Sequence, residues 1–307
     1  MSFNDNVTLD TSQVESGGGG GGGAPGGLVV GGGLGGIVVL ILTLLFNGIF
    51  GGGGDPTGAG AIDPSQVQPG GAESGQAFAR CKKGSDADAD VECRVIGTVN
   101  SVQAFWAGEL PRFGSTWQPT KTVLYNGSTR SACGTASNQV GPFYCPLDKK
   151  VYIDASFFQI LQDQFGSSGG PLAQEYVVAH EYGHALQDQL GLLGRAQQGG
   201  SGPESGSVRI ELMADCLGGV WAKHASTVKD EDTGTAFLET LTDQDIKDAL
   251  SAASAVGDDR IQEATSGRVT PESWTHGSAE ARQRWFLQGF RTGDLNSCDT
   301  FAVASVS

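Results

Sequence analysis

Hydrophobic residues are unevenly distributed along the chain, and their pattern divides it into four parts. Residues 28–50 form a run without any charged side chain, in which only Thr43 and Asn47 are polar. A helix rises about 1.5 Å per residue, so a run of this length can cross about 30 Å of hydrocarbon. The run predicts one N-terminal transmembrane helix, which would bring the chain into contact with a lipid bilayer.

The segments on either side of this run lack a regular hydrophobic period. Residues 1–27 are polar and acidic and end in glycines, so we expect a disordered leader. Residues 51–75 are rich in Gly and Pro, which is typical of a flexible linker. A cleaved signal peptide is the alternative, because the small residues Ala59–Ala61 resemble a cleavage site. Against it, no basic region precedes the apolar run, and the run is longer than a usual signal sequence.

The remaining part, residues 76–303, has the composition of a globular domain and contains all five Trp residues. Short apolar runs between residues 94 and 165 suggest a small β element, with Val151–Asp154 as a strand. Apolar residues at helical spacing dominate the later part of the chain. The pattern therefore predicts an α+β domain whose C-terminal part is mostly helical.

Charge excludes one class of partner. The chain carries 34 Asp and Glu against 19 Lys and Arg, which gives a formal net charge of -15. Proteins that bind nucleic acid neutralise phosphates with a basic stripe, and this sequence offers none. We therefore expect no nucleic-acid partner.

The six cysteines all follow the apolar run. Proximity along the chain pairs Cys81 with Cys93 and Cys133 with Cys145, which leaves Cys216 with Cys298. None has C-x-x-C spacing, which disfavours a thiolate zinc site or a redox motif. Three disulfides would indicate an extracytoplasmic domain, and hence a single-pass protein of the cell membrane. Six reduced, buried thiols are the alternative.

One helical segment carries metal-binding spacing. Pro171 suits the first helical turn and Gly191 suits the position just past the end. Between them, His180, Glu181 and His184 form an H-E-x-x-H pattern. Histidines four residues apart project from one helix face and can share a zinc ion, with the intervening Glu placed to act as a general base. Two solvated surface histidines are the alternative.

A catalytic zinc needs a third protein ligand, and the next helical segment offers a candidate. Glu211 and Asp215 are four residues apart, so they share a helix face among apolar neighbours. We expect Glu211 to bind the metal and Asp215 to accept the free N–H of a ligand histidine. An ordinary acidic helix face is the alternative.

His276 is the other candidate catalytic residue. It lies just before a segment that Ser278 would cap as a helix and that Gly293 would end. A histidine at a helix start could donate a hydrogen bond to the oxyanion of a tetrahedral intermediate. A local hydrogen bond that organises the helix start is the alternative.

From Cys81 to Phe301 the sequence resembles the neutral zinc metallopeptidases of bacteria. The segments that carry this resemblance are Val99–Gln103, Gly141–Pro146, Val151–Asp154, His180–His184, Glu211–Cys216, Gly257–Arg260, Thr275–Gly277 and Cys298–Phe301. The sequence is also similar to the gluzincins, in which a Glu-x-x-x-Asp helix supplies the third zinc ligand. The resemblance implies a zincin-like metallopeptidase domain with one catalytic zinc ion and an N-terminal membrane anchor. In such folds a strand like Val151–Asp154 can bind an extended substrate by main-chain pairing.

The sequence therefore predicts a membrane-anchored zinc peptidase that acts on a peptide or protein substrate. Zinc held by His180, His184 and Glu211 would lower the pKa of its water, and Glu181 would take the proton. A non-catalytic zinc domain that binds the cell envelope is the alternative function. Hydrolysis of a non-protein amide, such as a cell-wall crosslink, is a third possibility.

Overall fold

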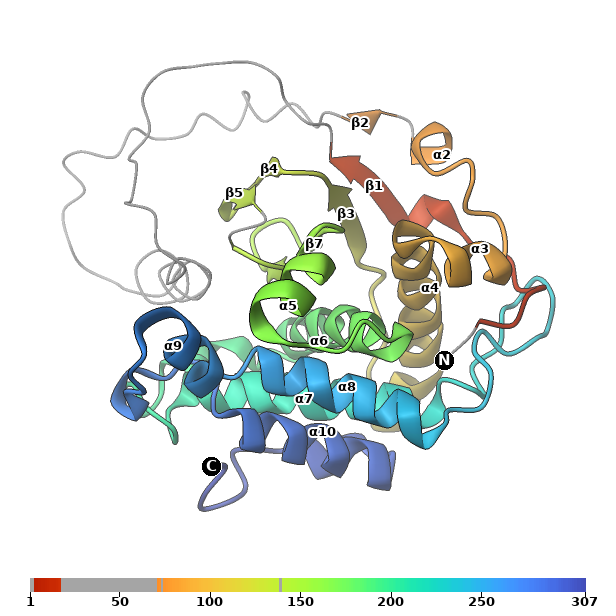
Figure 1. Ribbon diagram of the computed structural model, residues 1–307. Coiled ribbons are helices and arrows are strands. Elements are labelled where there is room, and N and C mark those ends of the chain that lie inside the picture. The colour runs from red at the N-terminus through yellow and green to blue at the C-terminus, as the bar shows by residue number, and fades with distance from the viewer. Residues whose placement is uncertain (1–2, 18–70, 73, 138–139) are drawn as a thin grey trace.

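The computed structural model describes residues 3–17, 71–72, 74–137 and 140–307. These residues form an α+β domain, as expected, in which a small sheet lies beside a larger group of helices (Figure 1). The α-helices are α2 (Ser74–Ala77), α3 (Gly84–Ala89), α4 (Val91–Glu109), α5 (Phe157–Phe165), α6 (Pro171–Gln189), α7 (Gly206–His224), α8 (Asp243–Ala255), α9 (Asp258–Ser266) and α10 (Ala279–Thr292). The strands are β1 (Val14–Gly17), β2 (Gly71–Ala72), β3 (Lys121–Tyr125), β4 (Ser128–Ser131), β5 (Gly134–Ser137), β6 (Phe143–Cys145) and β7 (Lys150–Asp154).

Five strands form one sheet in the order β2-β1-β3-β7-β6. The three central strands are parallel, whereas β2 and β6 at the two edges run antiparallel to their neighbours. The expected strand Val151–Asp154 is confirmed as most of β7. It lies between β3 and β6, so its main-chain groups are already paired on both sides. The expectation that this strand offers a free edge to a substrate is therefore wrong.

The two faces of the sheet are covered by different parts of the chain. Leu124 and Ile153, which are paired between β3 and β7, belong to the main hydrophobic core with the helices. The adjacent pair Val123 and Tyr152 points to the other face, as expected for the two-residue period of a strand. There it joins a smaller apolar cluster that includes residues of the β4–β5 hairpin.

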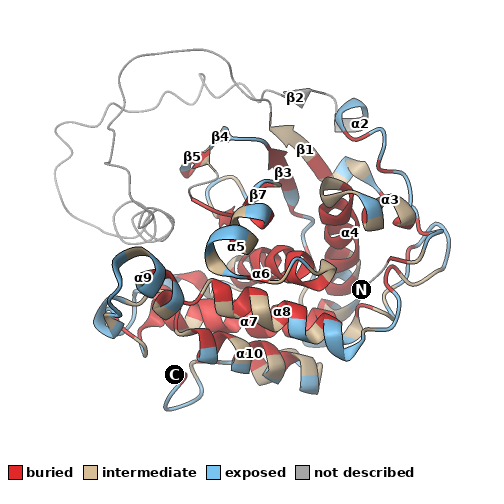
Figure 2. Ribbon diagram, in the orientation of Figure 1, coloured by how far each residue is buried: buried red, intermediate tan, exposed pale blue. Residues whose placement is uncertain are grey.

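The helical side of the domain is built around α6 and α7, which Figure 2 shows as mostly buried. The backbones of α7 and α10 touch at two glycines. A Cβ at Gly289 would lie 1.9 Å from the carbonyl oxygen of Cys216, and a Cβ at Gly219 would lie 2.1 Å from that of Phe286. Any larger residue at either position would push the two helices apart.

The N-terminal segment corrects the expectation of a disordered leader at residues 1–27. Residues 3–17 pack on the domain, where Phe3, Val7, Leu9 and Val14 are buried. β1 pairs in parallel with β3, and the side-chain amide of Asn100 holds the main chain of Asp10. The rest of the expected leader, and the expected linker 51–75 as far as residue 70, lie outside the described residues.

The expected localisation, a single-pass protein of the cell membrane, is also corrected. Throughout the described part of the chain, no helix is both long and apolar enough to cross a bilayer. The longest of these helices, such as α6 and α7, carry acidic and histidine side chains. The expected transmembrane helix 28–50 itself lies outside the described residues.

The small β element begins later than residue 94, where we expected it. Residues 91–109 form α4, and its first turn is capped by Asp90, whose side chain accepts hydrogen bonds from the N–H groups of Glu92 and Cys93. The helix is buried on nearly every side, chiefly against α3, α6 and the N-terminal segment. Within the expected region 94–165, the strands β3 to β7 run from residue 121 to residue 154.

All three expected disulfides are present. They join Cys81 to Cys93, Cys133 to Cys145, and Cys216 to Cys298. The second bond ties the β4–β5 hairpin to edge strand β6, and the third ties α7 to the C-terminal end of the domain.

Candidate metal centre

Helix α6 supplies two histidines to one buried site. Pro171 begins the helix after an extended Gly170, and Gly191 follows the end with a φ of 70°, which a glycine adopts without strain. His180 and His184 lie one turn apart, with ring centroids 4.8 Å from each other. Both side chains are buried, so the alternative of two solvated surface histidines does not describe this helix.

Helix α7 brings a carboxylate to the two rings. Its N-cap Ser205 accepts a hydrogen bond from the N–H of Val208, and Glu211 follows within the next turn. Nε2 of His180 lies 3.2 Å from Oε2 of Glu211, and Nε2 of His184 lies 3.5 Å from Oε1. These ligand atoms all lie within 4.8 Å of one another, so the three residues could hold a metal ion.

These spacings fit zinc. Zinc binds nitrogen and oxygen ligands at about 2.0–2.1 Å in a tetrahedron, which separates neighbouring ligand atoms by about 3.3 Å. Burial by itself would raise the pKa of Glu211, but the charges of His184 and His276 outweigh it and hold that pKa well below its usual range. The carboxylate is therefore ionised and ready to act as a ligand.

Glu181 lies beside these ligands on α6. The residue is buried, and its Oε2 atom has no hydrogen-bond partner among the described residues. Burial raises the pKa of Glu181; His180 and His184 oppose this effect and Glu211 adds to it. An unpaired carboxylate oxygen costs free energy in a protein interior unless a ligand or water completes it. The unpaired Oε2 of Glu181 therefore also fits a site that binds a metal ion together with a water molecule.

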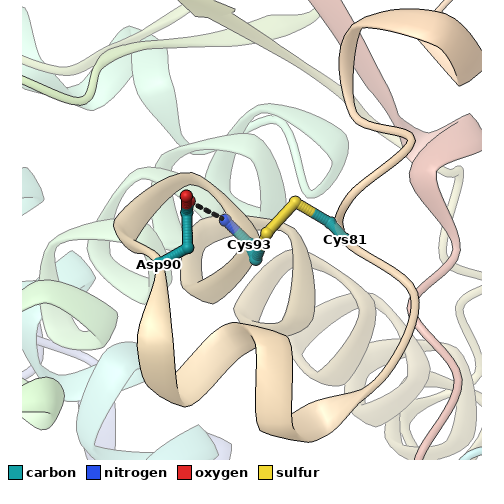
Figure 3. A group of neighbouring side chains, drawn as sticks. All are labelled: Cys81, Asp90 and Cys93. Atoms are coloured by element: carbon teal, nitrogen blue, oxygen red, sulfur yellow. Dashed lines mark hydrogen bonds between the residues drawn. A yellow bond between two sulfur atoms is a disulfide. The ribbon is translucent and has the colours of Figure 1, made fainter.

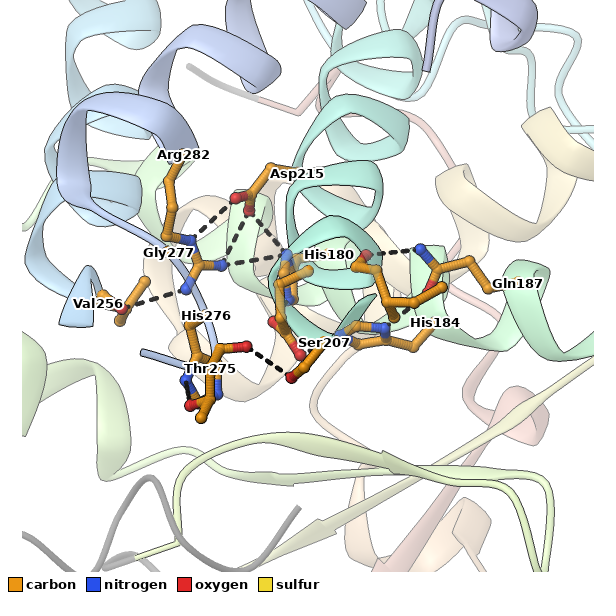
Figure 4. A network of polar contacts seen from close by, with 12 residues as sticks. His180, His184, Gln187, Ser207, Asp215, Val256, Thr275, His276, Gly277 and Arg282 are labelled. Carbon is orange, nitrogen blue, oxygen red and sulfur yellow. Dashed lines mark hydrogen bonds and ion pairs between the residues drawn. The ribbon is translucent and has the colours of Figure 1, made fainter. Parts of the chain in front are cut away.

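Nδ1 of each histidine, the ring nitrogen that does not face Glu211, contacts a different side chain (Figure 4). Nδ1 of His180 lies 2.8 Å from Oδ1 of Asp215, as expected from the sequence. Nδ1 of His184 lies 2.8 Å from the side-chain oxygen of Gln187, whose amide group donates to the main chain of α7. Gln187 was not among the expected site residues, although its position one turn after His184 could have indicated it.

His276 approaches the same site from the loop before α10. Its side chain is 14% exposed and its charge acts on Glu211. Asp258 was not among the expected site residues, but its carboxylate holds this loop. Oδ2 accepts hydrogen bonds from the N–H groups of Thr275, His276 and Gly277, and Oδ1 lies 3.2 Å from Nδ1 of His276.

A second group of potential ligands does not form a metal site. Cys81, Asp90 and Cys93 lie together at the start of α4 (Figure 3). Both sulfurs are consumed by the disulfide between them, and Asp90 caps the helix. The group therefore stabilises the helix start and offers no thiolate.

The comparisons with known proteins agree with this geometry. A sequence family described as "Putative neutral zinc metallopeptidase" matches residues 3–301. The chain is 57% identical over 229 residues to the uncharacterized protein Rv2575 of Mycobacterium tuberculosis, a match that covers 75% of this chain and 77% of that protein. It is 42% identical over 201 residues to the uncharacterized protein YpfJ of Escherichia coli K12, covering 64% of this chain and 66% of that protein. No solved structure matches the chain.

Proposed function

The chain belongs to the family of neutral zinc metallopeptidases, and from this premise we propose that it is a zinc-dependent peptidase that hydrolyses peptide bonds. The observation that carries the proposal is the buried set of His180, His184 and Glu211 with the unpaired carboxylate oxygen of Glu181 beside it. A purely structural zinc site would close all four positions around the metal, whereas three protein ligands leave one for a reactant.

In this proposal His180, His184 and Glu211 hold one zinc ion. Zinc, when bound, supplies a Lewis acid that lowers the pKa of water and polarises a carbonyl group. Asp215 and Gln187 fix the two imidazole rings so that each presents Nε2 to the ion.

Glu181 is the general base. Its carboxylate takes a proton from the attacking water and passes it to the nitrogen of the leaving amine. Burial raises its pKa above that of a solvated Glu, which makes it a stronger base and a more effective proton donor afterwards.

His276 donates a hydrogen bond to the oxyanion that forms on the substrate carbonyl. An ionised carboxylate can only accept hydrogen bonds. Nδ1 of His276, which faces Oδ1 of Asp258, therefore carries a proton. Burial opposes protonation of this imidazole, but Glu211 and Asp258 outweigh burial and raise its pKa. A protonated ring also carries a proton on Nε2, which is the donor that the reaction needs.

The edge strand β6 is the surface that we assign to the substrate backbone. It pairs with β7 on one side only in the described part of the chain, and it packs against α6. An extended peptide can add to such an edge through main-chain hydrogen bonds. This assignment replaces the expectation that Val151–Asp154 binds the substrate.

The test measures metal and cleavage together. Purified wild-type protein should contain about one zinc per chain and should cleave members of a peptide library. Glu211→Ala should lose both properties. Glu181→Gln keeps the shape of the side chain but cannot take a proton, so it should retain zinc and lose about 10²–10⁴-fold in kcat. Zinc binding without any cleavage that depends on Glu181 would instead support a non-catalytic zinc domain.

A further inference from the structure

We propose that Arg282 is a positioning residue of the metal centre. Its guanidinium holds the carboxylate of Asp215, and through it the imidazole of His180, in the orientation that presents Nε2 to the metal. The inference rests on the proposed function, because it gives Arg282 a purpose only if His180 is a ligand.

The contact between Arg282 and Asp215 has the geometry of a two-pronged ion pair (Figure 4). Nε donates to Oδ2 of Asp215 at 2.9 Å, and Nη2 donates to Oδ1 at 2.9 Å. Nη1 donates to the carbonyl oxygen of Val256 at 3.2 Å. A guanidinium fixed at three points in this way cannot rotate, so it also fixes the plane of the carboxylate.

The carboxylate in turn determines which nitrogen of His180 carries a proton. Oδ1 of Asp215 accepts from Nδ1 of His180 at 2.8 Å and from the hydroxyl of Tyr176 at 2.5 Å. An ionised Asp can only accept, so it selects the tautomer with a proton on Nδ1 and leaves the lone pair of Nε2 free. Asp215 can do this only while its carboxylate keeps this orientation.

Burial makes Asp215 dependent on its cation. The residue is 0% exposed and Arg282 is 3% exposed, so water screens neither charge. A carboxylate without a fixed partner in such a place would turn towards other hydrogen-bond donors, because leaving a buried charge unpaired is costly. Arg282 is the only Lys or Arg that forms an ion pair with Asp215 in the described part of the chain.

The arginine reaches this position because α10 lies directly against α7. Gly219 and Gly289 allow the two backbones to touch. Arg282 lies near the start of α10 and spans from Asp215 on α7 to Val256 just after α8. The metal ligand His180 on α6 is therefore oriented by residues from two further helices.

A purely structural role makes a different prediction. If Arg282 only balanced the charge of Asp215, a lysine would serve nearly as well. If it orients the carboxylate, a lysine should fail, because an ammonium group is a single point charge without the planar fork. The comparison of Arg282→Lys with Arg282→Gln therefore separates charge from geometry.

The experiment uses the full chain with Arg282→Lys, Arg282→Gln and Asp215→Asn. Arg284→Lys is the matched control on the same helix, because Arg284 binds main-chain carbonyls of the C-terminal tail. Zinc affinity is measured by competition with a chelator. Burial lowers the pKa of His180, but Asp215 and Glu211 outweigh burial and raise it to about 9 in the metal-free protein. The tautomer of His180 is therefore read above pH 9, where the ring is neutral, from ring ¹⁵N chemical shifts of histidine-labelled, metal-free protein, in which only four histidines contribute.

We expect Arg282→Lys to stay folded, to bind zinc about 10–100-fold more weakly and to show a mixture of His180 tautomers, with Arg284→Lys unchanged. Wild-type zinc affinity and an unchanged tautomer in Arg282→Lys would overturn the inference. If Arg282→Gln fails to fold, the zinc affinity and the His180 tautomer of Arg282→Lys still test whether Arg282 orients Asp215. If the wild type takes up no zinc, the proposed function fails, whereas the tautomer in metal-free protein still tests the role of Arg282.

Discussion

Oδ2 of Asp258 accepts the main-chain N–H of His276 at 2.7 Å, while Oδ1 of the same carboxylate lies 3.2 Å from Nδ1 of its imidazole. One side chain therefore holds both the backbone and the ring of this residue. The carboxylate is buried, and although burial raises its pKa, the hydrogen bonds and charge of His276 outweigh this and lower it. Asp258 is thus ionised at neutral pH and keeps the loop before α10 in place.

Replacing Asp258 with Asn should lower the pKa of His276. The side-chain amide of Asn has no charge, so it does not favour the protonated form of His276 as the carboxylate of Asp258 does. Glu211 also raises the pKa of His276, but a bound zinc ion would oppose that effect. His276 should then lose its proton at a lower pH than in the wild type. The ring proton of His276, followed by NMR against pH, measures this change. A pKa equal to that of the wild type would show that Asp258 serves only the backbone of the loop.

His276→Ala should lower kcat by about 10²–10³-fold and change KM little, because the lost hydrogen bond forms mainly in the transition state. Zinc content and melting temperature of the same variant provide the control. A stable, zinc-loaded variant with normal kcat would exclude His276 from the reaction. A lower melting temperature with normal kcat would leave it the local structural role that the sequence also allows.

Removal of the bond between Cys216 and Cys298 should destabilise the domain by about 2–5 kcal/mol, because the bond closes a loop between residues 82 positions apart. The Cys81–Cys93 pair spans only 12 positions, so its removal should cost less. Paired Cys→Ser variants, unfolded with urea, give the comparison. Equal losses in both variants would contradict the dependence on loop length.

Glu204 should make stability depend on acid pH. Burial alone would raise its pKa, but hydrogen bonds from Ser305, Val306 and Ser307 outweigh burial and lower it to about 2. A carboxylate with a lowered pKa stabilises the fold at pH values above its unfolded pKa, near 4.5, and this contribution is lost as the pH falls towards 2. Glu204→Gln should therefore unfold at less urea than the wild type at pH 6, with a smaller difference at pH 3.5.

The expected size of this effect is about 1 kcal/mol or less, since the side chain of Glu204 is 40% exposed and water weakens its interactions. Glu263→Gln is the matched control, because its carboxylate is 68% exposed and lies 4.0 Å from Arg260. A difference between wild type and Glu204→Gln that does not shrink on acidification would show that the shape of the side chain, and not its charge, holds the tail.

The features that the sequence predicted well depend on neighbours along the chain. His180 and His184 share a face because they are four residues apart on one helix, and any helix gives that result. Ser278 and Gly293 delimit α10 through local capping, and both are found where they were expected. The pairing of Cys81 with Cys93 followed from proximity in the same way.

The features that could not be predicted from the sequence depend on contacts between distant parts of the chain. Residues 91–109 are buried on nearly all sides, so they lack the polar face that distinguishes an amphipathic helix from a strand. Val14–Gly17 becomes a strand only because β3 lies beside it, more than a hundred residues later. Asp258 and Arg282 act on His276 and Asp215 through tertiary contacts, and no spacing rule connects them.

The pairing of Gly17 with Gly71 has a consequence for how the chain can vary. Gly17 ends β1 and Gly71 begins β2 as its antiparallel partner, so a short turn of the kind that joins two antiparallel strands could connect them directly. The entropy of closing a loop rises only slowly with its length, by about 0.6 kcal/mol for each doubling. A variant with such a direct turn between Gly17 and Gly71 should therefore differ from the wild type by only a few kcal/mol in stability and should keep the pairing of β1 with β3.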